Sequence, residues 1–114
     1  MRRMLLLALA GLASSAQAGE LVGQWCDRPL ENMAIMDSVI SIEIRDGGPM
    51  LVDRFRGSAR EAALRREGEG VFVEQETPDG YRIVGKDLEL FDDMGVIRTA
   101  FRMDDDAPAE ECWR

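Results

Sequence analysis

Residues 40–56 read ISIEIRDGGPMLVDRFR, and they give the clearest indication of the fold. The three isoleucines stand at every second position between polar residues, which is typical of a strand with one buried face. The turn residues Asp46–Pro49 follow, where glycine reaches positive φ freely and proline fixes the re-entry. Met50–Arg56 is then the next expected strand. The stretch predicts a hairpin of two antiparallel strands.

Short strands are expected on both sides of this hairpin. Upstream, Leu21, Gly23 and Trp25 alternate on one face of a first strand. Downstream, breaks carrying Asp, Gly or Pro separate four more expected strands, which are Gly70–Glu76, Tyr81–Gly85, Leu88–Phe91 and Val96–Met103. Short strands about ten residues apart predict a meander of antiparallel hairpins.

The segment Ser58–Glu67 carries two opposing signals. Ser58 and Glu61 match a helix capping box, and the alanines and arginines that follow favour a helix ending at Gly68. Against a helix, Arg56–Ala59 suits a tight hairpin turn, and a lone two-turn helix would interrupt the meander. We expect a strand here, which brings the number of strands to eight.

The sequence thus predicts an all-β fold, an antiparallel up-and-down meander of about eight strands curled into a small barrel. A barrel of eight strands is just wide enough for its inward side chains to fill. We therefore expect a packed interior without a ligand-sized cavity, formed by Leu21, Trp25, Ile40, Ile42, Ile44, Val71, Val73, Tyr81, Ile83, Leu88, Leu90, Ile97 and Phe101.

Residues 1–18 have the pattern of a cleavable signal peptide. Arg2 and Arg3 precede an apolar run, and Ala16-Gln17-Ala18 supplies the small residues of a cleavage point. The run is about half the roughly twenty residues that cross a bilayer. We therefore expect a periplasmic or secreted protein without a membrane anchor, in which residues 19–114 form one small β domain with an acidic C-terminal tail.

Two cysteines, Cys26 and Cys112, lie near the ends of this domain. An exported chain with two distant cysteines most simply pairs them, whereas redox and metal sites space their cysteines closely. A disulfide that closes so long a loop stabilises the fold by about 4–5 kcal/mol on the chain-entropy account. We expect this bond to tie the two ends of the barrel together.

Cleavage would leave 12 basic against 22 acidic residues, a net charge of −10. This balance argues against binding to nucleic acid and to anionic membranes. An acidic surface serves solubility, and it also raises the association rate with a basic partner protein. We expect a monomer, and a basic protein as its partner.

Catalytic and metal sites find little support in the composition. The chain contains no histidine, which excludes Ser-His-Asp, Cys-His and histidine–zinc sites within it. Neighbouring acids such as Glu89, Asp92 and Asp93 are too common here to indicate a glycosidase. The contiguous acids Asp104–Asp106 and Glu110-Glu111 match no calcium loop. We expect neither an enzyme nor a metal or cofactor site.

The connection Asp27–Asp37 is unusually long and contains several apolar residues. Pro29 suits the first turn of a short helix. The apolar residues of this loop either plug one end of the barrel as ordinary core or form a flexible lid over a ligand, since methionine adapts to irregular apolar shapes. Under the second reading, Met33 and Met36 are candidate ligand contacts.

Gly23-Gln24-Trp25 resembles the G-x-W signature on the first strand of lipocalins and related calycin barrels. The order of elements is similar too, with a long loop after this strand and basic residues on the last. In that superfamily a basic residue of the last strand packs across the tryptophan, which implies this role for Arg98 or Arg102. The alternation of the last strand instead places Ile97 and Phe101 inward and both arginines on the opposite face.

A second resemblance, in size, compartment and charge, is to the small exported inhibitors of c-type lysozyme, which are acidic β-barrels stapled by a disulfide. Their inhibitory loop carries an S-G-x-K or S-G-x-Y motif. The nearest run here is Arg56–Arg60, in which Gly and Ser are reversed. Within it, Arg60 is the candidate cation for insertion into an enzyme.

Two functions follow as hypotheses. The first is an exported, non-enzymatic binding protein for a basic partner, with inhibition of a basic enzyme through Arg60 as its sharpest form. The second is a carrier of a small apolar ligand in a lipocalin-like barrel, with Met33 and Met36 at the mouth.

Overall fold

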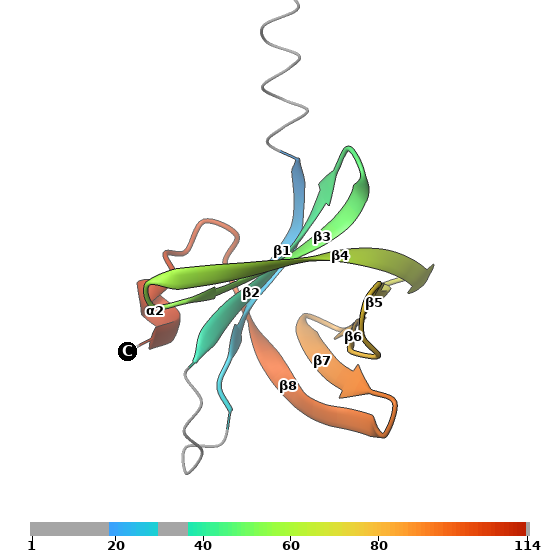
Figure 1. The fold of residues 1–114 in the computed structure, drawn as a ribbon. Helices are drawn as coiled ribbons and strands as arrows, with labels where there is room; N and C mark the ends of the chain where they lie inside the picture. Colours follow the sequence, from blue (N-terminus) through green and yellow to red (C-terminus); the bar gives the residue numbers. More distant parts are fainter. Residues whose placement is uncertain (1–18, 30–36, 114) are drawn as a thin grey trace, which may run out of the picture.

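The computed structural model describes residues 19–29 and 37–113. The elements in chain order are β1 (Glu20–Asp27), β2 (Ser38–Arg45), β3 (Gly48–Phe55), β4 (Ser58–Gly68), β5 (Val71–Glu74), β6 (Gly80–Val84), β7 (Asp87–Asp92), β8 (Gly95–Met103) and the short helix α2 (Glu110–Trp113). Each strand pairs antiparallel with the next, and β8 pairs with β1, which closes the sheet into a barrel (Figure 1). The predicted eight-stranded all-β meander is confirmed, and so is the strand at Ser58–Glu67. The expected signal peptide lies outside the described residues.

The β2–β3 hairpin has the register that its sequence predicts. Ile42 pairs with Leu51, and both side chains are fully buried. The turn ends at Gly48, whose φ of 112° lies in the left-handed region that favours glycine. Turn chemistry and hydrophobic alternation therefore agree on one pairing, which is the condition for a well-specified register.

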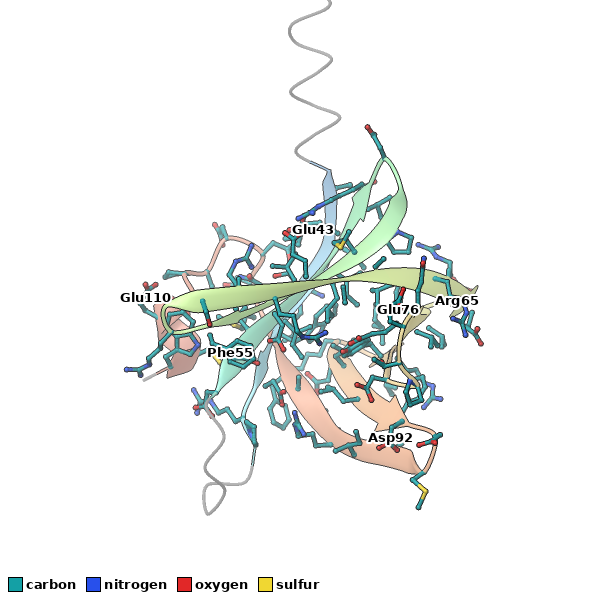
Figure 2. The ribbon with its side chains drawn as sticks, in the orientation of Figure 1. Glu43, Phe55, Arg65, Glu76, Asp92 and Glu110 are labelled. Carbon is teal, nitrogen blue, oxygen red and sulfur yellow. A yellow bond between two sulfur atoms is a disulfide. The ribbon has the colours of Figure 1, made fainter. Side chains whose placement is uncertain are left out.

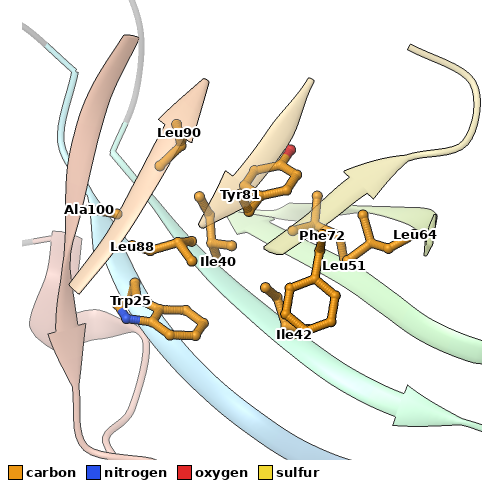
Figure 3. Close-up of a cluster of buried hydrophobic side chains, with 10 residues drawn as sticks. All are labelled: Trp25, Ile40, Ile42, Leu51, Leu64, Phe72, Tyr81, Leu88, Leu90 and Ala100. Carbon is orange, nitrogen blue, oxygen red and sulfur yellow. The ribbon is translucent and has the colours of Figure 1, made fainter. Parts of the chain in front are cut away.

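One cluster of buried side chains fills the barrel, and it contains six of the predicted core residues together with four others (Figure 3). The six are Trp25, Ile40, Ile42, Tyr81, Leu88 and Leu90, and the four are Leu51, Leu64, Phe72 and Ala100. The predicted residues Ile44 and Ile83 are half-buried. Period-two alternation thus identifies the centre of the core better than its margins.

A bulge explains the wrong prediction in β1. Leu21 is 36% exposed, because a register shift follows it and Val22 packs against the core instead. In β5, Val71 and Val73 were expected inward, but Phe72 between them is the buried residue and pairs with the buried Tyr81. All three residues are apolar, so their alternation does not show which face is inward.

A bulge also reverses which side chains of the last strand, β8, face the core. Ile97 and Phe101 were predicted inward, yet their side chains are 48% and 58% exposed. Ladder pairing jumps from Leu90 to Phe91 across an extra residue on β8, which marks a bulge there. Beyond this bulge Ala100 is fully buried, and the two arginines of β8 share its face. The prediction that these arginines face away from the core is therefore wrong.

Trp25 closes one end of the barrel. Its side chain is fully buried, and its indole Nε1 donates a hydrogen bond to the carbonyl of Lys86 at 2.8 Å. Arg102 lies over the ring, with Cζ 5.5 Å from the centroid. Gly23 lies beside the ring, and a Cβ there would stand 2.7 Å from the ring atom Cη2 and 3.3 Å from Cζ of Arg102. The absence of a side chain at Gly23 therefore leaves room for Arg102 to meet the ring, and this cation–π contact contributes about 0.5–2 kcal/mol.

The predicted disulfide between Cys26 and Cys112 is present, with Cα atoms 5.5 Å apart. Because side chains alternate along a strand, Cys26 points outward where its neighbour Trp25 points inward. The bond lies in a second apolar cluster outside the barrel, which also holds Val39, Met103, Ala109 and Trp113.

The disulfide fastens the chain after β8 to the outer face of β1 and β2. Gln24 Nε2 donates to the carbonyls of Asp104 and Ala107 at 2.8 and 2.9 Å. Arg28 Nη2 donates to the carbonyl of Cys112 at 3.0 Å. Helix α2 lies beside the β3–β4 turn as a result (Figure 1). The acidic segment after β8 is thus packed along the barrel wall.

The close approach of Gly23 to the indole predicts a sharp difference between two glycines. Gly23→Ala should destabilise the protein by about 1–3 kcal/mol, because the new methyl group collides with the fully buried ring of Trp25. Gly47→Ala is the control, since its added Cβ meets nothing within 4 Å. Denaturant unfolding measures both, and equal stability of the two variants would contradict this close contact.

Removing the disulfide should cost a few kcal/mol. The double variant Cys26→Ser and Cys112→Ser releases a loop with a sequence separation of 86 residues, so its free energy of unfolding should fall by about 2–5 kcal/mol. Thermal and urea unfolding provide the measurement. Two thiols that react with an alkylating reagent in the native, unreduced protein would show that the bond does not form.

Candidate functional site

A small pocket opens at the end of the barrel opposite the Lys86 turn. It has a volume of about 160 Å³. The residues that line it come from β1, β2, β3, β4, β6, β7 and β8 and from the residue before β6, and are Asp27, Ile40, Asp53, Arg60, Asp79, Gly80, Tyr81, Leu90, Phe91, Ile97 and Arg98. This pocket is below the roughly 300–1,000 Å³ of usual small-molecule sites.

Two arginines of the pocket are each held by a buried carboxylate. Arg98 donates from Nε and Nη2 to the two oxygens of Asp27, at 2.7 Å each. Arg60 donates from Nη1 and Nη2 to the two oxygens of Glu74, at 3.3 and 3.1 Å. Two-pronged pairs of this kind combine charge with fixed geometry. Both arginines are therefore already neutralised.

Glu74 connects three further groups. Besides Arg60, the hydroxyls of Tyr81 and Thr77 donate to its carboxylate. Burial opposes the ionisation of Glu74, but the hydrogen bonds from Arg60 and Tyr81 outweigh it and place its pKa below the ordinary value. Burial and the bond to Glu74 raise the pKa of Tyr81. The cluster is thus an ionised carboxylate held by an arginine and a protonated tyrosine.

Asp53 lacks a partner of this kind. In the sheet it pairs with Ile40 on one side and with Arg60 on the other, yet the guanidinium of Arg60 is directed to Glu74. Its Oδ1 atom is buried and accepts no hydrogen bond from any described residue. Burial raises its pKa above the ordinary value, and a hydrogen bond with Ser38 and the charge of Arg60 offset this only in part.

The site consequently has an excess of negative charge. Carboxylates outnumber guanidiniums, with Asp27, Asp53, Glu74 and Asp79 against Arg60 and Arg98. Apolar side chains, Ile40 and Leu90 among them, form the rest of the wall. Such an arrangement is suited to binding a hydrogen-bond donor or a cation.

The structure separates the residues that the sequence singled out. Arg60 and Arg98 meet at the pocket, whereas Arg102 lies with Gly23 and Trp25 at the closed end. Of the two arginines of β8, only Arg102 contacts the tryptophan. Met33 and Met36 lie outside the described residues, so their proposed place at the mouth stays a prediction.

Sequence reasoning missed the inward-facing acids, although a signal for them exists. Asp27, Asp53 and Glu74 each stand two residues after a core residue, namely Trp25, Leu51 and Phe72. Period-two alternation therefore places all three on the inner face. An acid at an inward position is unusual unless it is paired, so these three positions indicate a polar site at the open end of the barrel.

The rest of the described structure has fewer features of a binding site. An open cleft of about 410 Å³ lies outside the barrel, between the β3–β4 turn and α2, and is lined by Arg56, Gly57, Glu110 and Trp113. Figure 2 labels Glu110 on α2. Within the described ranges no three His, Cys, Asp or Glu side chains come together as metal ligands would. No described helix has the length and apolar character needed to span a membrane.

Glu74→Gln should lower the free energy of unfolding by about 2–3 kcal/mol near neutral pH, because two charge-assisted hydrogen bonds are lost. The pKa of Glu74 is lower in the folded than in the unfolded protein. Its contribution to folding stability is therefore complete above the unfolded-state pKa and is lost as the pH falls through the folded-state pKa. The difference between wild type and variant should therefore shrink in acid. The exposed Glu76, changed to Gln, is the control, and an equal effect of both changes would contradict the buried pair.

Comparison with known proteins identifies no relative. No protein-family model matches the chain, and no significant match appears among curated proteins or among solved structures.

Proposed function

We propose that this chain is an exported, non-enzymatic binding protein that recognises a basic protein. The signal-peptide pattern of residues 1–18 and the disulfide support export. The acidic excess of the sequence supports a basic partner. Inhibition of a basic enzyme is one outcome of such binding.

The observation that carries this proposal is the charge of the segment after β8. Asp104, Asp105, Asp106, Glu110 and Glu111 are all exposed on it, and no basic residue occurs between Asp104 and Trp113. Of these five carboxylates, only Asp105 forms an ion pair with a described residue, Arg102, at 2.7 Å. The other carboxylates are presented to solvent.

The segment is also fixed in place. The disulfide, the two bonds from Gln24 and the bond from Arg28 hold its backbone to the barrel. A charged surface that is ordered before binding loses less conformational entropy when a partner docks. This favours a specific acidic face over a solubilising tail.

The pocket favours polar recognition over the carriage of an apolar ligand. Its volume is about 160 Å³ and half of its wall residues are polar or charged, which suits a small basic group better than a lipid-like molecule. The carrier hypothesis therefore ranks second.

Binding to c-type lysozyme, a basic protein, tests the proposal. We expect salt-sensitive binding that weakens at least about tenfold between 50 and 300 mM salt, because exposed charges are screened. The triple variant Asp106→Asn, Glu110→Gln, Glu111→Gln should weaken binding at low salt by about tenfold. A matched triple variant with the same change of charge, Asp46→Asn, Glu69→Gln, Asp93→Asn, should weaken it by less than about threefold.

Isothermal titration calorimetry or surface plasmon resonance measures the dissociation constants of the wild type and the variants. If neither lysozyme nor a panel of other basic proteins binds at low salt, the proposal is wrong. If both triple variants weaken binding equally, the segment after β8 is not the recognition surface.

A further inference from the structure

We propose that the pocket at the mouth of the barrel binds one alkylammonium or guanidinium group, anchored on the carboxylate of Asp53. This inference deepens the proposed function, because a lysine or arginine side chain of a basic partner is one source of such a group. A free small amine is the other source.

The two arginines of the pocket do not supply Asp53 with a counter-charge. Arg98 uses Nε and Nη2 on Asp27, and Arg60 uses both Nη atoms on Glu74. Asp53 and Asp79 are the carboxylates left over. A cation that enters the pocket therefore meets a net negative site in spite of the two arginines.

Asp53 presents an acceptor that lacks a donor. Its Oδ1 is buried and accepts no bond from the described side chains or backbone. A buried polar atom without a partner costs free energy, and a charged one costs more. Asp53 also lines the pocket, so an N–H cation held there compensates the charge of its carboxylate, which the two arginines leave unpaired.

The shape of the pocket fits the stem of such a ligand. Ile40, Leu90 and the ring of Tyr81 are buried wall residues, and Phe91 also lines the pocket. The ring of Phe91 packs directly against Gly80, where an added Cβ would collide with it. Figure 3 shows Leu90, Ile40 and Tyr81 gathered at this side of the core. A volume of about 160 Å³ suffices for a four-carbon stem, because an apolar cavity of about 150 Å³ accepts benzene.

Binding should depend on pH through Asp53. Burial raises the pKa of Asp53. Of the charged groups that face it, Arg60 from β4 and Arg98 from β8 lower this pKa, and Asp27 from β1 raises it. Only the ionised carboxylate attracts a cation, so affinity should be full above this raised pKa and fall as pH drops through it. The neutral hydroxyls of Ser38 and Tyr81 do not change charge over this range.

The test uses n-butylamine as the probe, with n-butanol as the uncharged analogue of the same length. Titration of the disulfide-bonded protein, followed by NMR, should shift the methyl signals of Ile40 and Leu90 with butylamine. We expect butanol to bind at least about tenfold more weakly, because it lacks the charge. Asp53→Asn should lose at least about tenfold in affinity for butylamine. Asp46→Asn, which removes the same charge in the β2–β3 turn, should retain affinity within about twofold.

Two results would overturn the inference. One is butylamine leaving the Ile40 and Leu90 methyl signals of the wild-type protein unchanged, a readout that does not depend on any variant folding. The other is equal affinity of butylamine for the wild type and for a folded Asp53→Asn protein.

The lysozyme assay then separates the two sources of the cation. If Asp53→Asn weakens lysozyme binding at least about tenfold as well, the pocket receives a side chain of the partner. If lysozyme binding is unchanged while butylamine binding is lost, the pocket serves a free amine and the proposed function stands on the acidic segment alone. If butylamine binds but no basic protein does, this site stands and the proposed function fails.

Discussion

Strand β1 is buried on both faces over its second half, and the rest of the molecule depends on this constraint. Three consecutive side chains point in alternate directions and meet different surroundings. Trp25 faces inward and closes one end of the barrel, in contact with Gly23 and Arg102. Cys26 faces outward and fastens the acidic segment after β8. Asp27 faces inward again and holds Arg98 at the mouth.

These three contacts also join the first strand, β1, to the last strand, β8, and to the segment that follows it. β1 pairs with β8 through only a short ladder, from Gln24 to Cys26. Side chains reinforce this seam from both faces, through the cation–π contact and the Asp27–Arg98 pair inside and the disulfide outside. Closure removes the free edges of an open sheet, which are sites of aggregation. The seam therefore secures the fold and presents both candidate recognition surfaces, the mouth and the acidic segment.

The fold was largely predictable because alternation and turn residues agree along most strands. The Ile40–Arg45 strand and its glycine turn are the clearest case. Predictions failed where a bulge moves one residue out of step, as at Leu21 and Ile97, and in β5, where Val71, Phe72 and Val73 are all apolar. Bulges arise from the pairing of two strands, so the pattern of one strand alone does not reveal them.

The candidate site was less predictable, because its contacts join residues that are distant in sequence. Arg98 and Asp27 are 71 positions apart, and no local pattern relates them. The resemblance to calycin barrels implied a basic residue over Trp25, and Arg102 lies there, but the family itself stays a hypothesis. Arg60 was singled out for a loop motif, whereas its described partner is the buried Glu74.

The central claim is that the pocket holds the Asp53 carboxylate without a basic partner among the described residues. A ¹³C NMR titration of every side-chain carboxyl in the unliganded protein tests it most directly. The account predicts that the pKa of Asp53 lies above the ordinary value of aspartate and that the pKa of Glu74 lies below the ordinary value of glutamate. An Asp53 carboxyl that titrates like an exposed aspartate, or below it, would contradict the account.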